Sequence, residues 1–154
     1  MKLAQIQMHV TADKAANLRH AENLLRSVRG ADMAILPEMF CCPYDNACFR
    51  AYGEPEGGPA YQMLSRAARE LNLWLVGGSL PELDGDKIYN TAYVFDPTGT
   101  CVARHRKMHL FDIDVEGGQR FRESDTLSPG NDVTLFDTPW GRMGLCICFD
   151  LRFE

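Results

Sequence analysis

The sequence predicts an α/β fold, in which a layered sheet carries helices on one face. Two observations support this prediction. Along residues 2–79 the apolar residues follow strand and helix periodicities in turn, which gives the order β-α-β-α-β. From residue 84 onward, turn signals separate shorter apolar segments, which is typical of antiparallel hairpins.

The first part of the chain supplies the expected helices and the first strands. Residues 2–8 alternate in polarity as a strand does, and residues 14–29 carry apolar side chains at the three-to-four-residue spacing of an amphipathic helix. Residues 33–36 form a short apolar run of the kind found in strands buried on both faces. A second helix is expected at residues 60–71 and a third strand at residues 73–79.

The second part is expected to be mainly β. Residues 88–95 and 101–105 flank Asp96-Pro-Thr-Gly99, a turn sequence that indicates a hairpin. The last two strands are expected at residues 133–136 and 142–148.

Two long segments, residues 37–60 and 108–130, are expected to be irregular. The first carries four prolines and the second is rich in Asp, Glu and Gly. Long loops in compact domains often carry function, so we expect functional side chains in or beside these segments.

The composition describes one globular domain and argues against several classes of protein. Of the 154 residues, 45% are hydrophobic and 24% are charged, which is enough to bury a core. The net charge is −5 and the basic residues are scattered, so we expect no nucleic-acid surface. There is no apolar run long enough for a membrane span. Residues 1–10 lack a signal-peptide pattern, so we expect a cytoplasmic protein.

Without a secretory signal, the six cysteines are expected to be reduced thiols. The pairs Cys41-Cys42 and Cys146-x-Cys148 lack the two-to-four-residue gap of structural zinc sites, so no metal is expected. Cys146 lies on the last expected strand, where a cysteine usually acts as a small core residue.

Three chemically different side chains each follow an expected strand: Glu38, Lys107 and Cys148. A thiol, a carboxylate and an ammonium are what thiol-based acyl transfer requires, as nucleophile, base and positive charge for the transition state. Taken one at a time, they also fit a loop acid, a solvated strand end and a core cysteine. His105 and His109 flank the lysine and leave a Cys-His hydrolase as an alternative.

Together these motifs resemble the nitrilase superfamily of carbon–nitrogen hydrolases, and above all its omega-amidase branch. The matching segments span nearly the whole chain and are Leu36-Pro-Glu-Met-Phe40, Arg106-Lys-Met-His-Leu-Phe-Asp-Ile-Asp114, Arg122-Glu-Ser-Asp-Thr-Leu-Ser-Pro-Gly130 and Gly144-Leu-Cys-Ile-Cys-Phe-Asp-Leu-Arg-Phe153. The resemblance implies a nitrilase-type α-β-β-α sandwich. Residues 1–154 are expected to be a carbon–nitrogen hydrolase domain that is incomplete at its C-terminus.

The resemblance also implies a role for each candidate residue. Glu38 matches the general base, Lys107 the catalytic lysine and Cys148 the nucleophile. Glu123, otherwise a surface loop acid, matches a second glutamate beside the lysine. The backbone N–H of Phe149 is expected to join Lys107 in stabilising the oxyanion, and Lys107 is expected to lower the thiol pKa. No metal or organic cofactor is implied.

The implied activity is hydrolysis of a small omega-amide, of the 2-oxoglutaramate or 2-oxosuccinamate type, through a Cys thioester. Relatives that act on deaminated glutathione are the nearest alternative. The implied partners are a small-molecule amide and further copies of the chain, in a homodimer or a higher oligomer. The chain ends six residues after Cys148, so a second hypothesis is a catalytically silent half-domain that serves as an association module.

Overall fold

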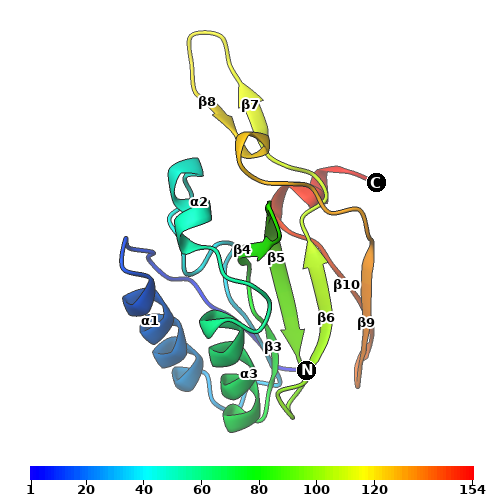
Figure 1. The fold of residues 1–154 in the computed structure, drawn as a ribbon. Coiled ribbons are helices and arrows are strands. Elements are labelled where there is room, and N and C mark those ends of the chain that lie inside the picture. The colour runs from blue at the N-terminus through cyan, green and yellow to red at the C-terminus, as the bar shows by residue number, and fades with distance from the viewer.

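A six-stranded sheet forms the centre of the molecule in the computed structural model, which describes residues 1–154 (Figure 1). Its strands follow the order β1-β2-β3-β5-β4, and β6 also pairs with β5. The first three strands are parallel, and the remaining pairings are antiparallel. The strands are β1 (Leu3–Gln5), β2 (Met33–Ile35), β3 (Trp74–Val76), β4 (Leu80–Asp84), β5 (Lys87–Phe95) and β6 (Cys101–Arg106).

Two long helices, α1 (Lys14–Ser27) and α3 (Pro59–Leu71), cover one face of this sheet (Figure 1). Helix α1 begins where the Asp13 side chain accepts a hydrogen bond from the backbone N–H of Ala16. Leu25 of α1 and Leu64 of α3 are fully buried, and each contributes about 2 kcal/mol through apolar burial. Neither helix, nor any other in the chain, is long and apolar enough to cross a membrane.

The opposite face of the sheet packs against a hairpin formed by β9 (Thr134–Thr138) and β10 (Gly141–Leu145). Side chains alternate along the central strands, so Leu75 faces the helices while its neighbour Val76 faces Phe136 of the hairpin. The chain therefore forms three layers, which are helices, sheet and hairpin (Figure 1).

The two long connections contain short elements of their own. Helix α2 (Asn46–Tyr52) lies in the first connection. Strands β7 (Asp112–Asp114) and β8 (Arg120–Arg122) form a hairpin in the second, and this hairpin projects beyond the sheet (Figure 1). Two 3₁₀ turns, η1 (Glu123–Asp125) and η2 (Cys148–Arg152), follow β8 and β10.

The expected α/β class is confirmed, and the β-α-β-α-β order holds apart from the additional helix α2, whereas several local expectations are wrong. Residues 37–60 and 108–130 are not wholly irregular, since they contain α2 and the β7–β8 hairpin. These elements were not expected because they are too short to show a clear apolar period in the sequence. Strand β4 is unanticipated, and it pairs with β5 across the turn at Gly85. The last strand ends at Leu145 rather than at residue 148, because the chain then bends into η2.

The ends of β2 and β3 hold the segment that carries Glu38. The backbone N–H of Leu36 donates to the carbonyl of Val76 at 3.0 Å, which continues the parallel pairing by one residue. Beyond it, the backbone N–H of Met39 donates to the Ser79 hydroxyl at 3.0 Å. The two strand ends therefore bracket Glu38 on both sides, and its position depends on the sheet rather than on a free loop.

Gly78 allows this close approach of the two strand ends. Its φ is +54°, a left-handed backbone conformation that residues other than glycine rarely adopt. A Cβ at this position would also overlap the carbonyl oxygen of Pro37, the residue before Glu38. The glycine is therefore required both for its conformation and for its lack of a side chain.

We expect Gly78→Ala to lower the free energy of unfolding by about 3 kcal/mol, because backbone strain and steric overlap add. The matched control is Gly85→Ala, since Gly85 has a φ of +58° and open space around it. This control should cost only about 1–2 kcal/mol, the cost of the backbone conformation. Urea unfolding of both variants measures the difference, and equal losses would contradict the account.

Candidate active site

The ammonium of Lys107 lies between two carboxylates at the centre of the candidate site. Lys107 directly follows β6, and its side chain is fully buried. Its Nζ donates to Glu38 Oε1 at 2.9 Å and to Glu123 Oε1 at 3.1 Å. Because an unpaired buried charge is expensive, this cluster is stable only as a unit.

The two carboxylates also determine the protonation of the lysine. Burial of the ammonium opposes its charge, but Glu38 and Glu123 outweigh burial and raise the pKa of Lys107 above its ordinary value. The lysine is therefore a fixed cation at neutral pH.

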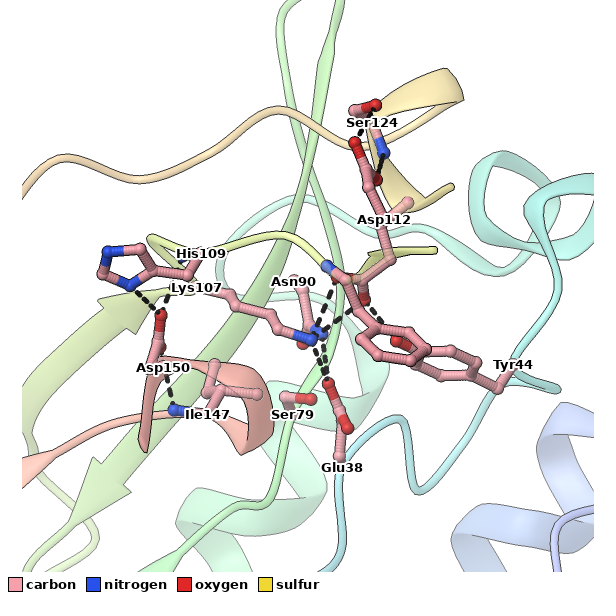
Figure 2. A network of polar contacts seen from close by, with 12 residues as sticks. Glu38, Tyr44, Ser79, Asn90, Lys107, His109, Asp112, Ser124, Ile147 and Asp150 are labelled. Atoms are coloured by element: carbon pink, nitrogen blue, oxygen red, sulfur yellow. Dashed lines mark hydrogen bonds and ion pairs between the residues drawn. The ribbon is translucent and has the colours of Figure 1, made fainter. Parts of the chain in front are cut away.

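Glu38 is the more accessible carboxylate, with 22% of its side chain exposed. Its Oε1 accepts a second hydrogen bond, from Asn90 Nδ2 at 2.8 Å (Figure 2). Asn90 lies on β5 and is completely buried. From the sequence, the segment Tyr89-Asn-Thr91 looks typical of the nitrilase superfamily, but nothing in it assigns Asn90 to Glu38.

Glu123 is the buried carboxylate, at the start of η1, and none of its side chain is exposed. Its Oε1 accepts a hydrogen bond from the Tyr44 hydroxyl at 2.6 Å, and its Oε2 accepts one from the backbone N–H of Phe111 at 2.6 Å. Burial and the bond to Glu123 raise the pKa of Tyr44, so the phenol remains a donor. The sequence analysis did not single out Tyr44, although it lies in the proline-rich segment after Glu38.

Cys148 begins the turn η2 and has a φ of +47°, which is rare for a residue other than glycine. Such strained conformations often mark functional positions. The thiol lines the same cavity as Glu38. Cys148 is exposed, but partial removal of its thiol from water and the neighbouring Glu38 carboxylate raise the pKa of Cys148, against the lowering influence of Lys107. The expected lowering influence of Lys107 on the thiol pKa is present, but the other influences outweigh it.

The cavity beside Cys148 has a volume of about 620 Å³, in the range of small-molecule sites. Phe149 lines it and contacts Phe111 edge to face, with ring centroids 5.3 Å apart. Its walls are mainly apolar, and Glu38 and Arg152 are the charged side chains among them. The lining residues are Glu38, Tyr44, Phe111, Cys148, Phe149, Leu151 and Arg152.

The structure thus brings Glu38, Lys107 and Glu123 into one cluster and places Cys148 and Phe149 on the adjoining cavity. The expectation that Cys146 is a core residue is wrong, because it lies beyond the end of β10 and is exposed. No group of three or more His, Cys, Asp or Glu side chains in residues 1–154 is arranged to hold a metal ion.

The alternative of a Cys-His pair receives no support from the histidines. The ring nitrogens of His105 contact Thr134 Oγ1 at 3.0 Å and Asp150 Oδ2 at 2.9 Å. His109 Nδ1 contacts Asp150 Oδ1 at 3.0 Å. Glu38, by contrast, faces both the thiol and the lysine.

Comparison with known proteins shows the family of the chain. The carbon–nitrogen hydrolase family model matches residues 2–154. Omega-amidase NIT2 from Danio rerio is 48% identical over 154 residues, which cover 99% of this chain and 56% of that protein. Omega-amidase NIT2 from Bos taurus is 49% identical with the same coverage. The chain therefore belongs to the carbon–nitrogen hydrolase family, and it spans about half the length of these curated relatives.

Solved structures agree with this assignment. Nit3 from Saccharomyces cerevisiae, described as a member of branch 10 of the nitrilase superfamily, superimposes with a TM-score of 0.86 at 38% identity. That match covers 99% of this chain and 57% of Nit3. The NitFhit protein of C. elegans gives a TM-score of 0.82 at 30% identity, over 98% of this chain and 38% of NitFhit. The expected nitrilase-type fold is confirmed.

Replacing Lys107 by Met should lower the free energy of unfolding by about 3–5 kcal/mol at neutral pH, because the buried Glu123 would lose its cation. The pKa of Lys107 is raised above 10.5. Its contribution is therefore fully present below pH 10.5 and is lost as the pH rises through the folded-state value. Urea unfolding should show a constant difference from the native chain up to about pH 10, with narrowing only above 10.5.

The matched control for this measurement is Lys87→Met, which removes an exposed lysine at the start of β5. That change should stay within about 0.5 kcal/mol. Equal effects of the two substitutions, or a difference that narrows well below pH 10.5, would refute the buried-cation account.

Alkylation of Cys148 should report a thiol pKa above the ordinary value of about 8.5, since partial removal from water and Glu38 both raise it. Glu38→Gln should lower that pKa, because it removes the nearby negative charge. Iodoacetamide rates as a function of pH, measured by mass spectrometry, test this. A Cys146→Ala background leaves Cys148 as the sole thiol of the tryptic peptide 143–152. A pH profile that is unchanged by Glu38→Gln would contradict the conclusion that the Glu38 carboxylate raises the thiol pKa.

Proposed function

We propose that the chain carries the catalytic cluster of a thiol-dependent amidase that hydrolyses a small omega-amide to the acid and ammonia. The observation that supports this most directly is the buried Lys107 ammonium, held by Glu38 and Glu123 beside the cavity that contains Cys148. The likeness to proteins named omega-amidases favours an amide of that class.

In the first step, the Cys148 sulfur attacks the amide carbonyl carbon while Glu38 takes the thiol proton. The raised thiol pKa fits this order, since the proton stays on sulfur until the base removes it during attack. Glu38 then delivers the proton to the departing nitrogen. The carbon–nitrogen bond breaks, ammonia leaves and a thioester remains on Cys148.

The negative charge that develops on the carbonyl oxygen requires fixed positive groups. Lys107 is a buried donor that is protonated at neutral pH and whose charge acts on the thiol, and we assign it this role together with the backbone N–H of Phe149. Glu123, which does not line the cavity, holds the ammonium in place, and Tyr44 and Phe111 donate to its oxygens.

In the second step, water replaces ammonia in the cavity. Glu38 removes a proton from the water, the hydroxide attacks the thioester carbon, and the carbon–sulfur bond breaks. The proton returns to the Cys148 sulfur as the carboxylic acid leaves. The cluster is then restored, and the cycle requires no group beyond the chain, the amide and water.

The alternative of a catalytically silent association module is favoured by one observation. Large apolar side chains are exposed on the hairpin and the last turn, among them Val133, Leu135, Trp140, Leu151 and Phe153. Exposed apolar surface of this kind marks interaction sites. Measurement of activity separates the two functions.

Purified 154-residue chain should release ammonia from 2-oxoglutaramate, as followed by a coupled glutamate dehydrogenase assay. Cys148→Ala should reduce release by at least about 10³-fold, and Glu38→Gln by about 10²–10⁴-fold, the usual contribution of a general base. Cys146→Ala, a thiol two residues away, is the matched control and should leave release unchanged.

Each result separates the hypotheses. Release that survives in Cys148→Ala would refute the thiol mechanism. Absence of release from a folded native chain would refute a self-sufficient amidase and favour the association module. Deaminated glutathione carries a dipeptide on its amide nitrogen and yields no ammonia, so 2-oxoglutarate is the product to compare. Faster formation of 2-oxoglutarate from deaminated glutathione than from 2-oxoglutaramate would assign the chain to the alternative substrate.

A further inference from the structure

The Asp150 carboxylate lies at the junction of two segments that carry candidate catalytic groups. It belongs to η2, the turn that begins with Cys148, and faces the backbone just after Lys107 (Figure 2). Its side chain is only 6% exposed. A buried carboxylate requires several donors, and the proposed mechanism leaves this one without a role.

Five donors converge on Asp150. Its Oδ1 accepts hydrogen bonds from the backbone N–H groups of Met108 at 3.1 Å and His109 at 2.8 Å, and from His109 Nδ1 at 3.0 Å. Its Oδ2 faces the backbone N–H of Ile147 at 3.0 Å and His105 Nε2 at 2.9 Å. Burial opposes the charge, but the bonds from His105, Ile147 and His109 outweigh it and lower the pKa of the Asp150 carboxyl.

These contacts connect both sides of the site. Met108 and His109 follow Lys107 directly in the chain, while Ile147 precedes Cys148. Ile147 and Asp150 bond reciprocally, because the backbone N–H of Asp150 also donates to the Ile147 carbonyl at 3.0 Å. The strained Cys148 therefore lies inside a closed turn that is attached to the lysine segment through one side chain.

We propose that Asp150 is a positioning residue, which holds the Cys148 turn in its strained conformation and at a fixed place relative to Lys107 and Glu38. The proposal rests on the proposed function in that it takes Cys148 as the nucleophile. Asp150 itself does not line the cavity with Cys148 and Glu38. Its effect on the reaction is transmitted through the backbone.

The donor pattern explains why a carboxylate is required. Backbone N–H groups face both oxygens, at Met108 and His109 on one side and at Ile147 on the other. An asparagine amide, in either orientation, would place its NH₂ group against at least one of these donors. Asp150→Asn therefore keeps the size of the side chain but breaks the connection between the two segments.

The test measures how much Glu38→Gln changes the pKa of the Cys148 thiol, which we call the coupling between the two residues. The pKa is obtained from the pH dependence of alkylation in the Cys146→Ala background. The groups that influence this thiol are Glu38, Lys107 and Glu123. With Asp150 present, Glu38→Gln should shift the alkylation profile. In Asp150→Asn the thiol pKa should move toward the ordinary value of about 8.5, and Glu38→Gln should then have no effect.

Asp137→Asn is the matched control, because Asp137 is exposed on β9 and pairs only with Arg142. In this variant, Glu38→Gln should shift the profile as it does in the native chain. Where the chain releases ammonia, Asp150→Asn should lower kcat about 10²-fold, the effect of roughly 1 Å of misplacement. KM should change little, since Asp150 is absent from the cavity lining.

A folded Asp150→Asn chain that responds to Glu38→Gln as the native chain does would overturn the proposal. If the variant does not fold, amide hydrogen exchange in the native chain tests whether Asp150 connects the two segments. Slow exchange of Met108, His109 and Ile147 at a common rate supports the connection, and fast or unrelated rates overturn it. Alkylation and hydrogen exchange can both be measured in a chain that has no amidase activity. Failure of this proposal can therefore be distinguished from failure of the amidase proposal.

Discussion

The burial of one ammonium between two carboxylates is the constraint on which the rest of the site depends. Lys107 has no access to water, so Glu38 and Glu123 must both be present to compensate its charge. Glu123 in turn requires Tyr44 and Phe111 as donors, and Glu38 requires Asn90. Each partner comes from a different segment, so this charge cluster connects parts of the chain that are far apart in sequence.

The sheet supplies the rigidity that such a cluster needs. Glu38 follows β2 and Lys107 follows β6, and both strands belong to the central sheet. Glu123 and Cys148, by contrast, begin short turns whose places are set by side-chain hydrogen bonds. Positive φ angles occur at Met39, next to the carboxylate, and at Cys148 itself. Strain at both positions is tolerated because the surrounding contacts hold them.

The layer structure also explains where apolar surface remains. Helices α1 and α3 pack on one face of the sheet through a core of 18 residues. The other face packs against the β9–β10 hairpin, which leaves Leu135 and Trp140 exposed. The chain spans about half the length of its curated relatives. The charge cluster is nevertheless assembled within these 154 residues.

Much of the fold can be predicted from the sequence, because long helices and the central strands have periods set by burial on one or both faces. The positions of Glu38, Lys107, Glu123 and Cys148 likewise follow from local motifs. Only the tertiary structure identified Asn90, Tyr44 and Asp150 as their partners. A buried polar side chain is explained by donors and acceptors from distant segments, and its own sequence neighbours carry no sign of them. The net rise of the thiol pKa has the same origin, since burial and the nearby carboxylate arise only when the chain folds.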